Sequence, residues 1–436
     1  MGNSRKLTIL NLSSMPIWSR GDKEGHPSVY NVLKGFAEAG HEVHYAWPRD
    51  YWQYSENKPM PEWEIGDFKH PDCLYMKYEG IHLHRFYTQN FIENSVKKSV
   101  NALKKGRGLI NYIHFSSVVR GAIRFGLSMT EKICPDVIYG HCEEACCAAY
   151  WVGLRAGVPN VSRIYGSRLY PVLGNLKATF ISYPRIVGHK IPCRYMIMTD
   201  DGTFGDQVLK KLNVPEERVR FWRNGVDDNY NSNLNGAALK AKHNILQEQP
   251  IILSSSRLEY WKRIDRLIHT APKVIAECPD VVYLILGDGK DRLRLESIVA
   301  NYGLQKNFRF VGQQPQQDVA AYMQCADIQC LLSDLTSANN PTLEAMMMGI
   351  CVVVLDTGNV HQIIETGNNG IIIGINQLDT LADHLIELIK DPQKRYTMGK
   401  NARIFAKKEF YSWNKRVQME VSLIETLCNT QKSSKG

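Results

Sequence analysis

The sequence predicts an α/β protein with two doubly wound parallel sheets that face a cleft. Short apolar runs alternate with helical stretches in both halves of the chain, as expected for parallel sheets. With 436 residues, the chain is too long for one ordinary core. An Asn- and Gly-rich stretch without a sustained apolar period predicts a linker near residues 228–246.

In the first half, residues 6–14 (KLTILNLSS) form a predicted strand, followed by a loop that contains Gly21 and Gly25. Residues 26–40 then predict a helix with apolar residues on one face, and residues 42–47 (EVHYAW) predict the next strand. This order is typical of a βαβ unit. Further strands are predicted at 135–140, 194–198 and 219–225.

The second half repeats the pattern more clearly. Its predicted strands are 251–256 (IILSSS), 281–286 (VVYLIL), 308–312 (FRFVG), 327–333 (DIQCLLS), 351–355 (CVVVL) and 370–374 (GIIIG), with helical stretches between them. Open α/β sheets bind ligands at the carboxyl ends of their strands, so we expect a ligand site between the two sheets.

Composition restricts the environment and the partners. Eleven cysteines without a regular spacing predict reduced thiols in a cytoplasm, and the N-terminus lacks the pattern of a signal peptide. No apolar run approaches the roughly 20 residues of a membrane-spanning helix. A net charge of +9 suggests an acidic partner: a nucleotide, a nucleic acid or an anionic membrane. Because no nucleic-acid-binding motif is present, we do not expect a nucleic-acid partner.

One segment, residues 93–130, combines basic and apolar residues. We expect it to contact an anionic membrane surface rather than to be an ordinary solvated helix face, which would place the protein at the inner face of that membrane. Its only acid is Glu93, and its seven basic residues are Lys97, Lys98, Lys104, Lys105, Arg107, Arg120 and Arg124.

Two loops that follow predicted strands carry groups able to bind a diphosphate. Arg257 and Lys262 follow the strand at 251–256. The planar guanidinium of an arginine can bind two phosphate oxygens at once, whereas the ammonium of a lysine is a single charge on a flexible side chain. Gly287 and Gly289 flank Asp288 in a tight turn where the backbone can approach a ligand. Taken alone, Arg257 and Lys262 could be solvated cations, and Gly287 and Gly289 could belong to a plain turn. Together they predict a sugar-nucleotide site.

A third element of this site is the segment NNPTLEAMMMG at 339–349. Pro341 at a predicted helix start leaves N–H groups available for an anion. Glu344 follows about one turn later among apolar residues, and its carboxylate could accept both ribose hydroxyls. The alternative for Glu344 is a solvated helix position.

These residues resemble those of glycosyltransferases of the GT-B fold, specifically the retaining family 4 that includes enzymes similar to glycogen synthase. The resemblance covers nearly the whole chain. It implies that Arg257 and Lys262 bind the donor diphosphate and act in catalysis, and that Glu344 binds the donor ribose. It also implies that His141, after the strand PDVIYG, contacts the donor sugar and acts in catalysis, although a histidine there is often a structural residue.

The same resemblance implies two Rossmann-like domains: an acceptor-binding domain at 1–235 and a nucleotide-sugar-binding domain at 236–405. A closing helix at 406–436 would cross back to the first domain. The glycine-bearing loop with Gly21 and Gly25 resembles the acceptor-side loop of the family.

One departure concerns the sugar half of the donor site. The family usually has a glutamate eight positions before the one at Glu344, and this chain has Thr336 there. The segment from Thr336 to Asn340 must then offer hydroxyls, amides and backbone N–H groups, and Asp334 is close enough in sequence to substitute. The predicted donor-binding residues near this position are Asp334, Thr336, Asn339, Asn340, Pro341 and Thr342.

The implied activity is transfer of a sugar, with retention, from a nucleotide-diphosphate sugar to a hydroxyl of a saccharide or lipid-linked acceptor. We expect a UDP-sugar rather than GDP-mannose as donor, and neither a cofactor nor a metal. Two alternatives stay open: a nucleotide-sugar epimerase, and a non-catalytic protein that binds a nucleotide sugar.

Overall fold

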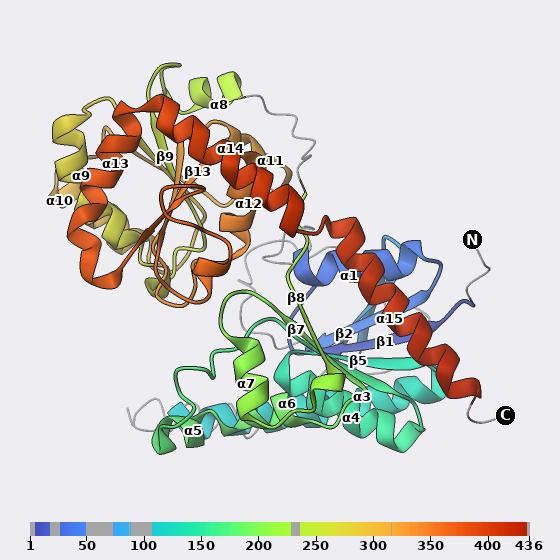
Figure 1. Ribbon diagram of the computed structural model, residues 1–436. Coiled ribbons are helices and arrows are strands. Elements are labelled where there is room, and N and C mark those ends of the chain that lie inside the picture. Colours follow the sequence, from blue (N-terminus) through green and yellow to red (C-terminus); the bar gives the residue numbers. More distant parts are fainter. Residues whose placement is uncertain are drawn as a thin grey trace. The chain divides into compact units, whose positions relative to one another are not determined.

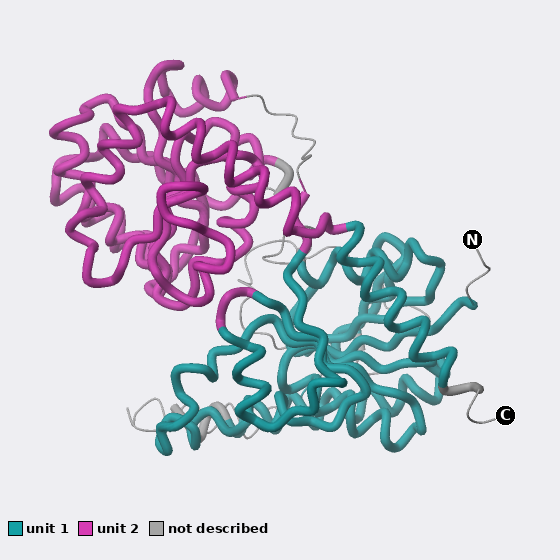
Figure 2. Tube along the Cα trace, viewed as in Figure 1, with its two compact units in different colours: residues 1–200, 204–224, 414–436 teal, residues 201–203, 225–413 magenta. Residues whose placement is uncertain are grey.

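The computed structural model describes residues 5–17, 27–48, 73–86, 88, 107–227, 236–314 and 316–433. The chain divides into two compact units (Figure 2). Unit 1 contains residues 1–200, 204–224 and 414–436, and unit 2 contains residues 201–203 and 225–413. The predicted cleft between the domains stays a prediction.

Unit 1 is an α/β unit with most of its helices between consecutive parallel strands (Figure 1). Its strands are β1 (Thr8–Ser13), β2 (Glu42–Pro48), β3 (Cys73–Tyr78), β4 (Ile81–Phe86), β5 (Val137–His141), β6 (Asn160–Ile164), β7 (Tyr195–Thr199) and β8 (Val219–Trp222). Its helices are α1 (Pro27–Glu38), α3 (Arg107–Ile133), α4 (Cys142–Ala156), α5 (Leu176–Ile181), α6 (Tyr183–Lys190), α7 (Gly205–Lys211), the 3-10 turn η1 (Glu216–Arg218) and α15 (Trp413–Ser433).

The eight strands of unit 1 lie in the order β3-β4-β2-β1-β5-β6-β7-β8. All neighbours pair in parallel except β3 and β4, which are antiparallel. The chain builds outwards from β1 in both directions, so the topological switch point lies between β1 and β5. The predicted strands near residues 6, 42, 135, 194 and 219 are present.

The strands β3, β4 and β6 are not predicted from the sequence. A two-residue turn joins β3 and β4, and Glu79 and Gly80 both have positive φ there, at 46° and 82°. Such a turn fits the twist of a tight antiparallel hairpin. Because β6 (Asn160–Ile164) is a short run that includes Ser162 and Arg163, its composition gives little strand signal.

The C-terminal helix α15 is held in unit 1 by buried charges. Glu420 accepts a hydrogen bond from the Tyr139 hydroxyl at 2.6 Å, and Arg416 lies 2.9 Å from its other oxygen. The guanidinium of Arg163 lies 3.9 Å from Glu420. Burial raises the pKa of Glu420, but Arg163 and Arg416 outweigh it, so its pKa lies below the ordinary value.

Unit 2 is a second α/β unit in which helices again separate the strands (Figure 1). Its strands are β9 (Ile251–Ser255), β10 (Val282–Leu286), β11 (Phe308–Gly312), β12 (Ile328–Leu331), β13 (Cys351–Leu355) and β14 (Ile371–Ile373). Its helices and 3-10 turns are α8 (Gly236–Lys242), η2 (Tyr260–Lys262), α9 (Ile264–Glu277), α10 (Arg292–Asn301), α11 (Gln316–Gln324), α12 (Asn340–Met348), η3 (Val360–Gln362), η4 (Ile375–Thr380), α13 (Leu381–Lys390) and α14 (Pro392–Glu409).

The sheet of unit 2 is parallel throughout, with the order β11-β10-β9-β12-β13-β14. Both of its faces are buried. Leu253 and Leu284 belong to one hydrophobic cluster, whereas Ile252 and Ile285 belong to another, as alternation along a strand requires. All six predicted strands of this half are present. The switch point lies between β9 and β12.

The boundaries between the units differ from those predicted from the sequence. The sequence predicts boundaries at 235/236 and 405/406, and the contacts in the structure place them at 224/225 and 413/414. The two crossing segments bind each other within unit 2: the Val226 amide donates to the Tyr411 carbonyl at 2.8 Å, and the Trp413 amide donates to Asp227 at 3.0 Å. Part of the predicted linker packs on unit 2 as α8, because Leu239 is buried there.

Among the described residues, no helix is both long enough and apolar enough to cross a membrane.

Candidate functional site

The predicted donor residues of unit 2 follow strands that meet at its switch point. Arg257 and Lys262 follow β9, Asp334 and Thr336 follow β12, and these two strands are neighbours in the sheet. The amide of Asp334 donates to the Trp261 carbonyl at 2.9 Å, which joins the two loops directly. The structure therefore gathers them at the edge where open α/β sheets bind ligands.

The loops after β9 and β10 are pressed together, backbone against backbone. The Leu258 amide donates to the Asp288 carbonyl at 3.0 Å, and the Asp291 amide donates to the Leu258 carbonyl at 3.0 Å. A Cβ at Gly287 would overlap the Ser256 carbonyl oxygen, and a Cβ at Gly289 would overlap the Leu258 carbonyl oxygen. Gly287 also has φ of 126°. Both glycines are thus required by contact between the loops, and their contact with a ligand stays a prediction.

The two predicted cations differ in their surroundings. Arg257 is exposed, and Lys262 is half-buried in η2 with its ammonium 4.3 Å from the centre of the Trp261 ring. That contact holds a flexible lysine near the loop. The next residue, Arg263, has φ of 54° and starts α9. One cation is therefore freely presented and the other is supported by an aromatic ring.

Asp334 is held by two arginines. Its carboxylate lies 2.7 Å from Arg266 and 3.4 Å from Arg263, and Arg266 also donates to the Leu332 carbonyl at 2.8 Å. These contacts fix the start of the loop after β12 onto α9. Asp334 is thus a structural residue in this arrangement, and its predicted substitution for the family glutamate gains no support.

Thr336 is buried at the position where the family glutamate is expected. Its hydroxyl accepts a hydrogen bond from the Ala338 amide at 3.1 Å. Gly202 and Gly358, both with positive φ, cover it so closely that a Cβ at Gly202 would overlap the Thr336 hydroxyl. The Gly202 carbonyl in turn accepts from the Asn359 amide at 3.1 Å. A glutamate would not fit at this position without rearrangement.

Helix α12 starts at Asn340, one residue before the predicted start at Pro341, with Asn339 as its N-cap and Pro341 in its first turn. The Thr342 amide is already bonded to the Asn339 carbonyl at 3.0 Å, and the Thr342 hydroxyl donates to the Ser337 carbonyl at 2.6 Å. This N-terminus therefore offers an anion fewer N–H groups than we predict from the sequence. Glu344 is half-buried, one turn further along, and Asn340 is the first helical residue.

His141 ends β5 in unit 1 and is fully buried. Its Nδ1 lies 2.7 Å from the Tyr165 hydroxyl and its Nε2 lies 3.0 Å from the Asn11 side-chain oxygen. Burial lowers the pKa of His141 to about 3, so the ring is neutral. Both ring nitrogens are engaged, which supports the structural alternative. The predicted contact with the donor sugar stays a prediction.

Two carboxylates near His141, those of Glu143 and Glu144, are not among the site residues predicted from the sequence. Glu143 and Glu144 lie in the first turn of α4, directly after the switch-point strand β5. Burial raises the pKa of both carboxyl groups, and Ser14 donates to Glu144 at 2.9 Å. Raised carboxyl pKa values at strand ends mark candidate acid–base groups. In the sequence, two glutamates just after a predicted strand were the pattern that could have identified these candidates.

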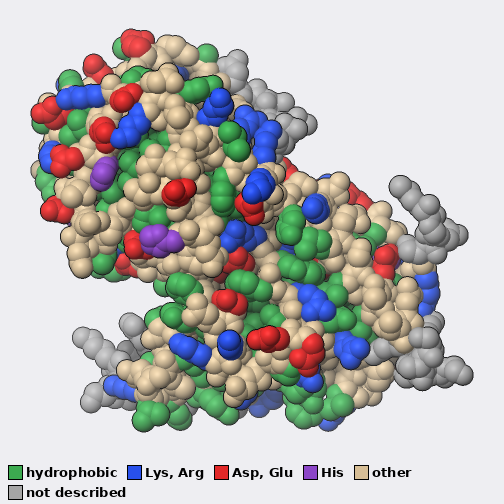
Figure 3. All heavy atoms as spheres, viewed as in Figure 1, with side chains coloured by type: hydrophobic (Ala, Val, Ile, Leu, Met, Phe, Trp, Pro, Cys, Tyr) green, Lys and Arg blue, Asp and Glu red, His purple; other side chains and the backbone are tan. Residues whose placement is uncertain are grey.

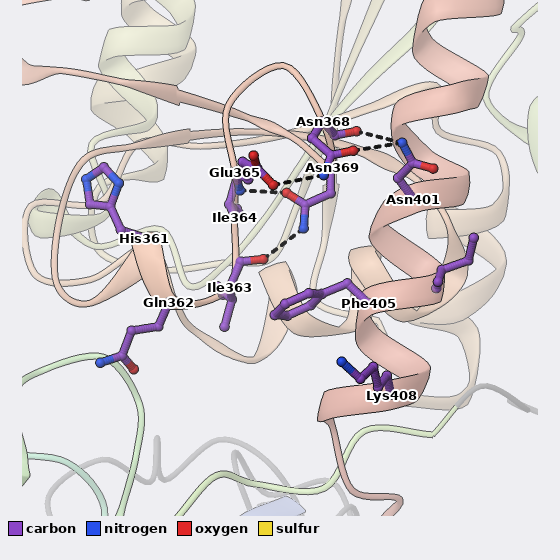
Figure 4. A pocket seen from close by; sticks show the side chains of 11 residues that line it. His361, Gln362, Ile363, Ile364, Glu365, Asn368, Asn369, Asn401, Phe405 and Lys408 are labelled. Atoms are coloured by element: carbon purple, nitrogen blue, oxygen red, sulfur yellow. Dashed lines mark hydrogen bonds between the residues drawn. The ribbon is translucent and has the colours of Figure 1, made fainter.

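Unit 2 also has a pocket of about 580 Å³ on another part of its surface (Figure 4). It is formed by η3, the following loop and α14, and Asn368, Asn369 and Asn401 point towards one another in it. Asn369 accepts from the Glu365 amide at 2.7 Å, and Asn401 donates to Asn368 at 2.9 Å. Its lining, among the described residues, includes none of the predicted donor residues.

Gly21 and Gly25 lie outside the described residues, so their predicted acceptor-side role stays untested.

Comparison with protein families identifies the class of unit 2. Residues 237–405 match the family described as glycosyl transferases group 1, which confirms the predicted resemblance. N-acetyl-alpha-D-glucosaminyl L-malate synthase of Bacillus anthracis is 25% identical over 202 residues, 46% of this chain and 52% of that protein. A GDP-mannose-dependent monoacylated alpha-(1-6)-phosphatidylinositol monomannoside mannosyltransferase of Corynebacterium glutamicum is 29% identical over 184 residues, 41% of this chain and 47% of that protein. The chain thus spans about half the length of these relatives.

The solved structures show the same fold over nearly the whole chain. HepE of Anabaena, in complex with UDP and glucose, aligns with a TM-score of 0.66 and 18% identity, and the alignment covers 98% of this chain and 100% of that chain. The predicted fold class, two Rossmann-like α/β units of the GT-B type, is therefore confirmed.

The neutral His141 makes a testable contribution to stability. A buried histidine whose pKa is lowered destabilises the folded state as the pH falls below about 6.5, because only the unfolded state takes up the proton. With a pKa of about 3, His141 lowers the free energy of unfolding by about 2 kcal/mol between pH 7 and pH 5. Over this pH range, the free energy of unfolding of His141→Gln, measured by chemical denaturation, should fall by about 2 kcal/mol less than that of the wild type.

His269→Gln is the control, because it removes an exposed imidazole of unit 2 in place of the buried one in unit 1. An unchanged slope in His141→Gln would contradict the structural assignment, and turnover of the same variant would test the predicted sugar contact.

Proposed function

We propose that the protein is a retaining glycosyltransferase that moves a sugar from a nucleotide-diphosphate sugar to a hydroxyl of a saccharide or lipid-linked acceptor. The observation that supports this most strongly is the position of Arg257 and Lys262. They follow β9 beside the loop after β12, at the switch point of a parallel sheet in a glycosyl transferases group 1 domain.

The reaction in this proposal depends on leaving-group stabilisation. As the bond between sugar and diphosphate breaks, negative charge grows on the diphosphate, and Arg257 and Lys262 stabilise it. The acceptor hydroxyl approaches the same face of the sugar, and its proton passes to the departing phosphate. Most of the acceleration then comes from positioning and fixed charge, without a protein nucleophile and without a metal.

Glu344 and the loops of unit 2 would hold the rest of the donor. The Glu344 carboxylate accepts hydrogen bonds from the ribose hydroxyls in this proposal, and the rigid turn at Gly287 and Gly289 borders the diphosphate. We favour a UDP-sugar because the structurally similar HepE is in complex with UDP. The Corynebacterium relative is named as GDP-mannose-dependent, so a thermal-shift screen with UDP- and GDP-sugars is the direct comparison.

An epimerase is the competing enzyme, because it could use the same donor site. It would change the sugar nucleotide when no acceptor is present, whereas a transferase needs an acceptor to form its product. A non-catalytic binder would bind the nucleotide sugar and leave it unchanged. Product analysis by NMR, with and without acceptor, separates the three.

The donor assignment predicts that Arg257→Ala and Lys262→Ala each lower kcat by about 100-fold to 1000-fold, because each removes a charge that stabilises the leaving group. Steady-state transfer assays provide the measurement. Both side chains reach the protein surface, so the melting temperature should change little.

Lys306→Ala is a matched control. Lys306 is an exposed cation of unit 2 that precedes β11, and its removal should leave kcat unchanged. Undiminished transfer by both Arg257→Ala and Lys262→Ala would contradict the assignment.

We also propose contact with an anionic membrane surface. Residues 93–106 of the predicted basic segment lie outside the described residues, and the rest lies in α3, where Arg120 and Arg124 are exposed. Beside α3, helix α5 presents apolar side chains to solvent: Leu176 is 90% exposed and Phe180 is 71% exposed. Hydrophobic side chains are visible at the surface over α5 in Figure 3. Basic and apolar groups together favour an anionic lipid interface.

Sedimentation with anionic liposomes should show binding that weakens at high salt, because basic side chains attract the lipid charge. The double variant Leu176→Ser, Phe180→Ser should bind at least tenfold more weakly, since it removes the apolar contact. Neutral liposomes are the control. Absence of salt-sensitive binding would reject the proposal.

A further inference from the structure

Three ligand-type side chains lie together in unit 1, on β2 and β4. Glu42, His44 and His82 each offer one ligand atom, and these atoms lie within 4.8 Å of one another. The arrangement follows from the register: His44 and His82 are paired across β2 and β4, and Glu42 is two residues before His44. Residues paired across strands, and residues two apart along one strand, point to the same face of a sheet.

The geometry points to a binding site for Zn²⁺ or a similar divalent transition metal, with Glu42, His44 and His82 as its ligands among the described residues. Two imidazole nitrogens and one carboxylate oxygen are a donor set that zinc uses in sites with an open position. The separation of His44 Nε2 and Glu42 Oε1 is 3.2 Å. This is close to the edge of about 3.4 Å that a tetrahedron with zinc–ligand bonds of about 2.1 Å requires.

Neighbouring groups orient both imidazoles. The Tyr75 hydroxyl lies 2.8 Å from Nδ1 of His82, and Nε2 of His84 lies 3.1 Å from Nδ1 of His44. In each case the partner engages Nδ1, so Nε2 of the same ring is the candidate ligand atom. Such partners fix the tautomer and orientation of metal-binding histidines.

The rings are also held by stacking. His44 and His82 are 4.6 Å apart between ring centres at 15°, and His84 packs on Phe125 of α3 at 5.7 Å.

Two lysines, Lys6 and Lys77, lie beside the cluster. Lys6 lies 3.1 Å from Oε2 of Glu42, whereas His44 is near Oε1, so the two oxygens have different partners. Lys77 faces His82 from β3, but its side chain is exposed and its charge is therefore screened.

The position of the cluster indicates a structural or regulatory metal. Glu42 is the first residue of β2 and His82 the second of β4, so the cluster lies near the amino ends of these parallel strands. Ligands of open α/β sheets bind at the opposite, carboxyl ends. A metal here would join β4, and with it the hairpin partner β3, to β2. It is independent of the donor site in unit 2.

The test is calorimetric titration of Zn²⁺ into the full-length protein after removal of metals with a chelator. We expect about one equivalent of Zn²⁺ per chain in the wild type. Glu42→Gln and His82→Gln should each bind at least 100-fold more weakly, since each removes a ligand, and Tyr75→Phe about tenfold more weakly, since it removes an orienting partner. The absorption spectrum of bound Co²⁺ should show nitrogen and oxygen ligands without thiolate.

His361→Gln is the matched control, because this exposed histidine pairs with Asp356 at 2.8 Å on unit 2 and should not affect the Zn²⁺ equivalent. Zn²⁺ should raise the melting temperature of the wild type and not that of Glu42→Gln. The proposal is overturned if the wild type binds no stoichiometric Zn²⁺, or if Glu42→Gln and His82→Gln bind it as tightly as the wild type. Neither result depends on glycosyl transfer.

Discussion

The close contact between the loops after β9 and β10 is the constraint on which the proposed donor site depends. The hydrogen bonds of Leu258 to Asp288 and of Asp291 to Leu258 fix the path of the chain between Arg257 and Lys262. The contact is close enough that only glycine fits at positions 287 and 289. Since the loop backbone is fixed before any ligand arrives, less ordering is required when an anion binds beside it.

The loop after β12 is fixed by a different set of contacts. Asp334 is held between Arg263 and Arg266, and Thr336 is buried beneath Gly202 and Gly358. In many family members a glutamate is expected where this chain has Thr336, and here the available space matches the smaller side chain. In the proposed complex, the sugar half of the donor would therefore be recognised by groups other than the side chains of Asp334 and Thr336.

Much of the fold was predictable because it depends on local patterns. The strands of unit 2 are uninterrupted apolar runs, since both faces of its sheet are buried, and each was found from the sequence. The β3–β4 hairpin and β6 were missed because they lack such runs. The ionic contact of Glu420 with Arg163 joins residues 257 positions apart in the sequence, and such contacts leave no local pattern.

For the candidate site, the sequence predicted which backbone elements carry the residues, but it did not predict the contacts of their side chains. The strand–loop order placed Arg257, Lys262 and Glu344 on the correct elements of unit 2. It could not show that both nitrogens of His141 are bonded within unit 1, or that Asp334 is held by arginines. Likewise, the pairing of His44 with His82 depends on the register of β2 and β4, which only the structure provides.

The central claim is that Arg257 and Lys262 bind the diphosphate of the donor, and affinity for UDP compared with UMP tests it most directly. If the claim holds, calorimetry should show that the wild type binds UDP at least about 100-fold more tightly than UMP, because charged hydrogen bonds to the second phosphate contribute roughly 1.5–3 kcal/mol each. In the double variant Arg257→Ala, Lys262→Ala this ratio should fall to near one. An undiminished preference for UDP in that variant would contradict the account.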